Sequence, residues 1–181
     1  WKLSSRKREL LVRRFELPAP PDTLVLLDCF DPIGFEGVPD GLSRLKDTLT
    51  ETALAVARMQ MEGGNPVRLP LYGARTGEFK ADRAGYLSLL QEDLAYQIFR
   101  GGEPFDKVLH VELRRMRRTG ATIVITTRLD AQIVEGVKHI RRSGPSVRFY
   151  LVTFTPEAPQ YEQYVAQLQR HLVEVCYVTP A

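Results

Sequence analysis

Apolar residues form three nearly uninterrupted runs along the chain, each of a length that suits one strand of a sheet. The runs lie at residues 23–30, 121–127 and 147–154, and prolines and glycines stand close to them, as in Pro20-Pro21 and Ser143-Gly144-Pro145. Strands that are apolar on both faces are typical of parallel sheets covered by helices on each side. The three runs therefore predict the central strands of an α/β domain.

Between these runs, apolar residues recur at the three- and four-residue spacing of amphipathic helices. The longest such segment follows Asp40, an expected N-cap, carries Leu42, Leu45 and Leu49, and ends at Gly63-Gly64. Further helices are predicted at 82–99, 104–118, 130–142 and 160–173, and further strands at 9–17, 67–72, 78–81 and 174–178. This order predicts a doubly wound, mostly parallel sheet with helices on both faces and one antiparallel edge strand. Pro70 cannot donate to a ladder, so we expect an edge or a bulge there.

The first apolar run leads directly to Asp28, and open α/β sheets bind ligands outside the carboxyl ends of their strands. Asp31, Glu103 and Asp130 are expected in loops at the same edge. One interpretation is therefore a hydrolase-like or nucleotide-binding domain that uses a crevice above Asp28. The chain has no P-loop, no Gly-x-Gly-x-x-Gly and no Gly-x-Ser-x-Gly sequence, so we do not expect an enzyme.

The charge of the chain is close to balanced, with a formal net charge of +3. Nucleic-acid binding would require aromatic residues interleaved with the basic ones, and we expect no nucleic-acid partner. The residues Arg114, Arg117 and Arg118 form a predicted positive helical face that could dock on an acidic protein surface. Cys29 and Cys176 fall in predicted central strands and lack metal-ligand spacing, so we expect two buried free thiols.

The start of the chain and its longest apolar runs indicate how this domain relates to a larger protein. No apolar run approaches the ~20 residues that span a bilayer, and the sequence opens on Trp1 without an initiator Met. We therefore expect a piece of a longer protein. Residues 1–22 would be an arm and strand that lead in from an upstream region, and residues 23–181 would form the α/β domain.

The opening residues resemble the signature of a bacterial family, domain of unknown function 58. The residues that carry the resemblance are Trp1, Lys2, Ser5, Arg6, Leu10, Val12, Arg13 and Glu16. The element order agrees over the rest of the chain. The resemblance implies a von Willebrand factor A-like fold in the cytoplasmic part of a membrane-anchored bacterial protein. It also implies a non-enzymatic adaptor that works with a MoxR-type AAA+ ATPase.

The same resemblance implies a magnesium site, in which the first loop supplies Asp-x-Ser-x-Ser and later loops supply a threonine and an aspartate. Here Asp28 is present, but Phe30 and Pro32 stand at the serine positions and Thr127 stands at the later aspartate position. A hard divalent ion requires oxygen ligands, so we expect a degenerate site and no cofactor. Residues that could rebuild a Mg²⁺ site are Asp28, Asp31, Asp130 and Glu103. Otherwise Asp28 would cap a loop or pair with Arg128.

Overall fold

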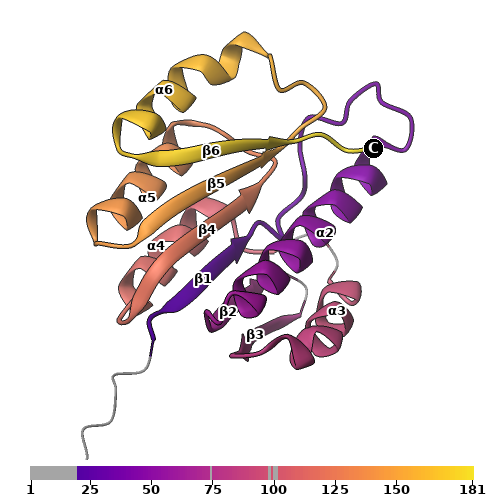
Figure 1. Cartoon of the computed structure of the whole chain (residues 1–181). Helices are drawn as coiled ribbons and strands as arrows, with labels where there is room; N and C mark the ends of the chain where they lie inside the picture. Colours follow the sequence, from indigo (N-terminus) through magenta and orange to yellow (C-terminus); the bar gives the residue numbers. More distant parts are fainter. Residues whose placement is uncertain (1–19, 74, 98, 100–101) are drawn as a thin grey trace, which may run out of the picture.

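The computed structural model describes residues 20–73, 75–97, 99 and 102–181, and the account below is confined to them (Figure 1). The predicted strand at 9–17 and the proposed N-terminal arm up to residue 19 lie outside the described residues. Asp22, the last residue assigned to the arm, already begins the first described strand.

A six-stranded sheet forms the centre of the described chain (Figure 1). Its spatial order is β3-β2-β1-β4-β5-β6, and every neighbouring pair is parallel except β2 and β3. The predicted mostly parallel sheet with one antiparallel edge strand is thus confirmed. The strands are β1 (Asp22–Leu27), β2 (Val67–Tyr72), β3 (Thr76–Ala81), β4 (Thr119–Thr126), β5 (Ser146–Val152) and β6 (Val173–Val178).

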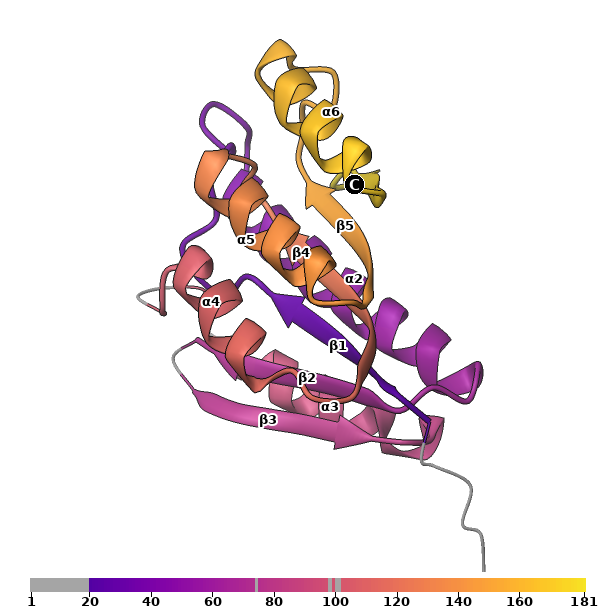
Figure 2. The same cartoon turned by 90° about the vertical axis from the view of Figure 1, so that its left-hand side faces the viewer.

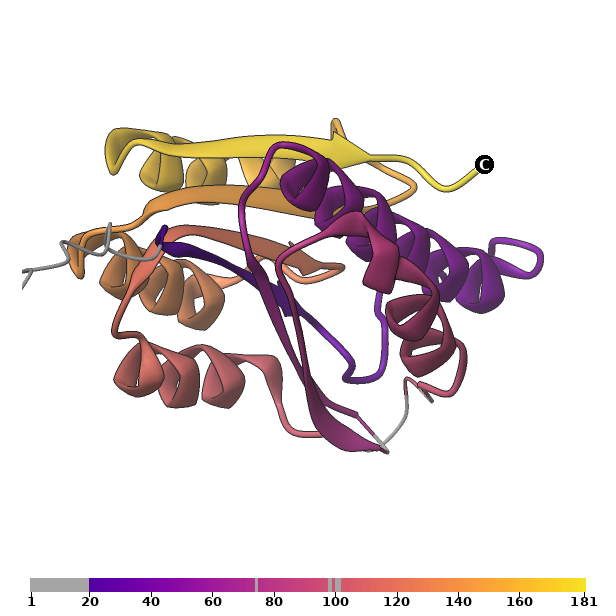
Figure 3. The ribbon, with the colours of Figure 1, turned by 60° about the horizontal axis from the view of Figure 1, so that its bottom comes forward.

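Helices cover both faces of this sheet, as predicted. One face carries α2 (Gly41–Glu62) and α3 (Leu87–Ala95), and the other carries α4 (Phe105–Arg115), α5 (Ala131–Arg142) and α6 (Glu162–Arg170). Figure 2 shows α4 and α5 in front of the sheet, and Figure 3 shows β2 and β3 between α4 and α3. The domain is therefore a three-layer α/β sandwich.

The first apolar run supplies side chains to both layers of core. Val25 and Leu27 pack toward α2 and α3, whereas Leu24 and Leu26 pack toward α4 and α5, and all four are buried. Successive residues of a strand point to opposite faces, so only a run without polar interruption can fill two cores at once. This is why β1 could be recognised from sequence.

Several predicted boundaries are wrong by a few residues. Strands β1 and β5 end at Leu27 and Val152, before the residues predicted to end them. The predicted helix 82–99 is a 3₁₀ turn at Ala84–Tyr86 followed by the shorter α3. Gly85 in its first turn disfavours a regular helix there. The predicted helix 160–173 likewise starts with a 3₁₀ turn, Pro159–Tyr161, and α6 ends at Arg170.

The structure corrects two predictions about single residues, the N-cap role of Asp40 and the edge or bulge at Pro70. Asp40 precedes α2 in a left-handed conformation with φ 53°, and its side chain makes no capping hydrogen bond. Pro70 lies in a strand with neighbours on both sides and pairs with Glu78 without a register shift. The β1–β2 ladder runs only to Leu24↔Arg68, so Pro70 sits beyond it and needs no donor toward β1.

Candidate functional site

The carboxyl ends of β1 and β4 meet at the middle of the sheet. The chain passes from β1 to β2 on one side and later returns to β4 on the other side, so the strand order reverses between them. Such a switch point is where open α/β sheets place their ligands. Asp28 follows β1 at this point, and Thr126, Thr127 and Arg128 stand at the end of β4.

Asp28 is held by three donors from these two strand ends. Its Oδ2 accepts hydrogen bonds from Thr126 Oγ1 at 2.6 Å and from Arg128 Nε at 3.0 Å. Its Oδ1 accepts from the backbone amide of Phe30 at 3.0 Å. Only 2% of Asp28 is exposed. The expectation that Asp28 caps a loop or pairs with Arg128 is confirmed, because it does both.

Arg128 is the cationic partner of this site, and its side chain is 15% exposed. The guanidinium lies over the ring of Phe30, 4.9 Å from the ring centroid, and Nη2 donates to the carbonyl oxygen of Asp31. Its backbone amide donates to Thr126 Oγ1 at 2.9 Å. The Thr126 hydroxyl thus accepts from Arg128 and donates to Asp28, which fixes both partners of the ion pair.

Burial raises the pKa of Asp28, because the charged carboxylate has lost its water. The Thr126 hydroxyl, the positive charge of Arg128 and the Phe30 amide act in the opposite direction. These donors stabilise the carboxylate at a place where water cannot reach it. Asp28 does not face an open crevice, so this arrangement gives no support to a catalytic or nucleotide-binding role for its carboxylate.

The residues at this edge do not fit a divalent cation. Phe30 and Pro32 offer no side-chain oxygen, and the hydroxyl of Thr127 accepts a hydrogen bond from the Ile33 amide at 3.1 Å. The remaining carboxylate, Asp28, is already paired with a guanidinium that repels a second positive charge. Magnesium prefers near-octahedral oxygen coordination, and this set of donors does not supply it.

The residues considered for a rebuilt metal site do not converge. Asp31 is exposed and contributes its backbone carbonyl to Arg128. Asp130 caps α5, where its Oδ1 accepts from the amides of Gln132 and Ile133 at 2.8 and 3.0 Å. Within the described parts of the chain, no three His, Cys, Asp or Glu side chains form a group that could hold a metal ion.

The loop from β1 to α2 places apolar side chains on the surface at this edge. Ile33, whose amide is tethered by Thr127, is 45% exposed. Leu42 was predicted to belong to the buried face of its helix but is also exposed. The roles of Thr126 and Thr127 were missed by sequence reasoning. The only available signal was a Thr-Thr-Arg sequence directly after a buried strand.

The arginines predicted to form one positive helical face are divided by the end of α4. The helix ends at Arg115, and Met116 takes an extended conformation because the chain must turn to pair Thr119 with Asp22. Arg114 therefore lies on α4, whereas Arg117 and Arg118 lie in the connection to β4. These two residues stand at the amino edge of the sheet, opposite Asp28.

A buried ion network beside these arginines was not predicted. Glu112 of α4 is 0% exposed, and its oxygens bind Arg68 Nη1 at 2.7 Å, the Tyr72 hydroxyl at 2.5 Å and Arg115 Nη1 at 2.8 Å. Arg68 also binds Glu78 at 2.9 Å. This network ties α4 to β2 and β3, and the half-exposed Arg115 forms its outer end.

Comparison with known proteins identifies the fold. Neither a scan against known protein families nor a search of curated proteins found a match. Among solved structures, the SpRpn10 von Willebrand factor A domain is similar, with a TM-score of 0.53 and 11% identity over 90% of each chain. The conserved hypothetical protein BatB from Bacteroides thetaiotaomicron is similar with a TM-score of 0.53 and 12% identity, over 89% of this chain and 91% of that chain. The domain therefore has a von Willebrand factor A-like fold.

The described helices were also searched for membrane spans. None of them combines the length and the apolar composition that crossing a bilayer requires.

Proposed function

We propose that this chain is a non-enzymatic protein-binding domain whose carboxyl edge contacts its partner without a metal ion. The observation that supports the proposal is the position of Arg128. Its guanidinium is bound to Asp28 at the end of β1 and remains partly exposed at the switch point of the sheet. It is a fixed guanidinium group, paired with Asp28, at the place where a von Willebrand factor A-like fold would otherwise use a cation.

The contacts of Arg128 suit the recognition of a carboxylate on a partner. Asp28 binds its Nε, Asp31 binds its Nη2 and Phe30 lies against its plane, so the side chain is ordered before the partner arrives. A pre-ordered side chain loses less conformational entropy on binding. The exposed Ile33 would add apolar contact area next to this charge. An acidic side chain flanked by apolar residues is the partner chemistry that this edge fits.

The identity of the partner and the cellular setting form the finer part of the proposal. The resemblance of the opening residues to domain of unknown function 58 proteins supports a MoxR-type AAA+ ATPase as the partner. It also supports a place on the cytoplasmic side of a membrane-anchored bacterial protein, with the anchor upstream of this domain. In this setting the domain would be an adaptor between the membrane protein and the ATPase.

The test is direct binding between this chain and the MoxR-type ATPase encoded in the same genome, measured by isothermal titration calorimetry. Nucleotide is omitted so that chelation does not act through the ATPase. We expect the same affinity in EDTA and in millimolar Mg²⁺. We expect binding to be lost when Ile33→Asp introduces an acidic side chain beside Arg128. Binding that requires Mg²⁺ would contradict the proposal.

Two further variants separate a loss of contact from a loss of fold. The double variant Asp28→Asn with Arg128→Gln removes both charges together and leaves no carboxylate buried without its cation, so it should fold and fail to bind. Arg142→Ala removes an exposed arginine at the end of α5 and should bind like the native chain. Full binding by the folded double variant would exclude Arg128 as the contact.

A further inference from the structure

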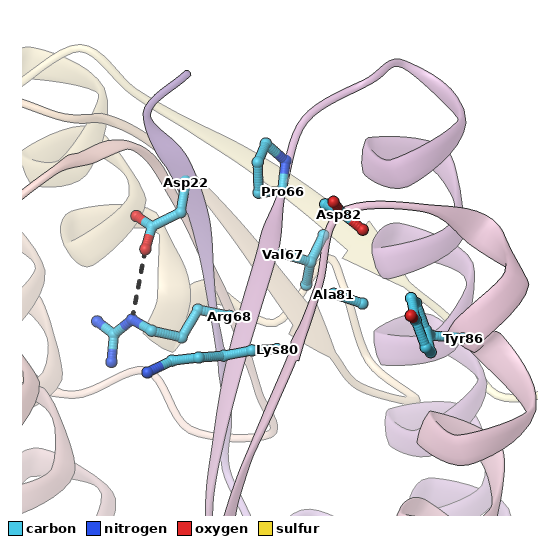
Figure 4. Close-up of a pocket in the computed structure, with 8 residues that line it drawn as sticks. All are labelled: Asp22, Pro66, Val67, Arg68, Lys80, Ala81, Asp82 and Tyr86. Carbon is cyan, nitrogen blue, oxygen red and sulfur yellow. Dashed lines mark ion pairs between the residues drawn. The ribbon is translucent and has the colours of Figure 1, made fainter. Parts of the chain in front are cut away.

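Two adjoining pockets form a groove at the amino edge of the sheet, opposite the Asp28 site. One pocket, of about 380 Å³, extends to Pro66, Val67 and Tyr86, and the other, of about 270 Å³, extends to Arg115, Arg117 and Arg118. Asp22, Arg68 and Lys80 line both pockets, so the two pockets adjoin each other at these side chains. The close-up in Figure 4 shows Arg68 and Lys80 on one side of β2 and β3 and Tyr86 on the other side.

One end of this groove has an excess of positive charge. Five of its lining side chains are basic and two, Asp22 and Glu78, are acidic. Glu78 and the buried Glu112 are already paired with basic side chains, whereas Asp22 has only a long ion pair with Arg68, at 3.7 Å. Glu78 binds Lys80 at 2.6 Å and Arg68 at 2.9 Å, and Glu112 binds Arg68 and Arg115 at 2.7 and 2.8 Å. The groups left over are the guanidinium groups of Arg117 and Arg118.

Arg117 and Arg118 are exposed, and no carboxylate of the described residues lies within ion-pair distance of either. The backbone that carries them is held in place, because the carbonyl oxygen of Arg118 accepts from the amide of Asp22 at 3.1 Å. Thr119, the next residue, already pairs with β1. The backbone of the two arginines is therefore fixed at the edge of the groove, and their charged groups are accessible to a ligand.

The other end of the groove is mostly apolar, and the acidic side chain at that end, Asp82, is paired with Arg83 at 3.1 Å. Tyr86 is 44% exposed beside Pro66, Val67 and Ala81. An exposed aromatic side chain at the wall of a pocket is a common contact for an apolar residue of a partner. Between the two ends, the ion pair of Asp22 with Arg68, at 3.7 Å, contributes little net charge.

We propose that this groove binds an extended acidic segment of a partner protein, with its carboxylates on Arg117 and Arg118 and an apolar side chain against Tyr86. Asp22 and Glu78 in the walls oppose a densely charged group such as phosphate. A concave groove with an aromatic end is also a poor match for the flat surface of a membrane. This site is separate from the carboxyl edge, so its test does not depend on the function proposed above.

The test is fluorescence polarisation with a labelled peptide, Glu-Asp-Glu-Gly-Leu-Phe, at low ionic strength. Reversing both charges with Arg117→Glu and Arg118→Glu should weaken binding by about tenfold or more, since each exposed pair contributes modestly. Tyr86→Ala should weaken binding as well, and it should do so equally at high salt because the contact is apolar. A peptide with Lys-Lys-Lys in place of the acidic residues should not bind.

The matched control is the pair Arg114→Glu and Arg142→Glu, which changes the net charge equally at two exposed residues outside the groove. It should leave peptide binding unchanged within about twofold. An equal loss of peptide binding in both double variants would show that only the net charge of the protein matters, and it would overturn the proposal. Displacement of the peptide by millimolar inorganic phosphate would also overturn it. The proposal would also be overturned if the chain did not bind the peptide but bound phosphatidylglycerol vesicles in a way that depends on Arg117.

Discussion

The ion pair of Asp28 and Arg128 determines which ligands the carboxyl edge of the sheet can accept. An arginine at the end of β4 brings a permanent positive charge within 3.0 Å of the carboxylate, and the Thr126 hydroxyl holds both groups. The carboxylate is then satisfied by the protein itself and offers no open oxygen to an ion. The same residues that close the site to a metal leave a guanidinium partly exposed to a partner.

Removal of Arg128 should therefore cost stability. In Arg128→Ala the carboxylate of Asp28 stays buried without its cation, and breaking a buried pair costs about 3–5 kcal/mol. Arg128 is partly exposed, so we expect the lower end of this range. Urea denaturation of the variant and of the Asp28→Asn, Arg128→Gln double variant measures it. The double variant should lose less unfolding free energy than Arg128→Ala. Equal losses in the two variants would show that the unpaired carboxylate of Asp28 is not what destabilises Arg128→Ala.

The loss of unfolding free energy in Arg128→Ala should also depend on pH. Burial already raises the pKa of Asp28 in the native chain, and loss of the Arg128 charge, which acts in the opposite direction, should raise this pKa further in the folded variant. A group with a raised folded pKa stabilises the fold below its unfolded pKa and loses that contribution as pH rises through the folded pKa. The difference in unfolding free energy from the native chain should thus shrink as pH falls from about 7 toward about 4. A constant difference would show that Asp28 does not take up a proton.

The two cysteines should differ in reactivity, although both were expected to be buried in central strands. Cys29 follows β1 and is buried, and burial raises its pKa to about 12. Cys176 lies on the edge strand β6 and is only partly buried, and burial raises its pKa as well. Iodoacetamide labelling followed by mass spectrometry should modify Cys176 first and Cys29 only on unfolding. Labelling of Cys29 at the same rate would mean that the β1 end opens readily.

At the scale of elements, α4 is positioned by a charge network as well as by apolar packing. Glu112 projects from its last turns into contact with Arg68 of β2, the Tyr72 hydroxyl and Arg115. Phe105, Val108 and Leu109 supply the apolar face of the same helix. Because Glu112 is fully buried, its carboxylate depends on all of these donors.

Glu112→Ala should therefore destabilise the domain by about 3 kcal/mol or more. The side chain of Arg68 is only 9% exposed, and the variant removes one of the carboxylates that it binds. The double variant Glu112→Leu with Arg68→Met replaces the charged pair with apolar side chains of similar size and should lose much less. A double-mutant cycle by urea denaturation gives the coupling between the two residues. A coupling near zero would show that Glu112 acts mainly through Tyr72 and Arg115.

At the scale of the whole molecule, the sheet and its two helical layers could be predicted, and the site could be predicted only in part. Runs such as Leu24–Leu27 carry the fold because burial on two faces excludes polar residues from a strand. The end of α4 could not be predicted, because pairing of Thr119 with β1 is a long-range contact that overrides helix propensity. The Glu112 network was missed for the same reason, since Arg68 is distant in sequence.

A whole-molecule measurement of metal dependence tests the central argument about the site. We expect thermal unfolding in excess EDTA and in millimolar Mg²⁺, Mn²⁺ or Ca²⁺ to coincide, because Arg128 holds the position that an ion would need. An ion at about 100 times its dissociation constant would add about 2.7 kcal/mol. For a domain of this size that is a rise in Tm of roughly 5–10 °C. A rise of this size in the native chain that disappears in Asp28→Ala would mean that Arg128 moves away and Asp28 binds the ion. The proposed partner contact would then be metal-mediated after all.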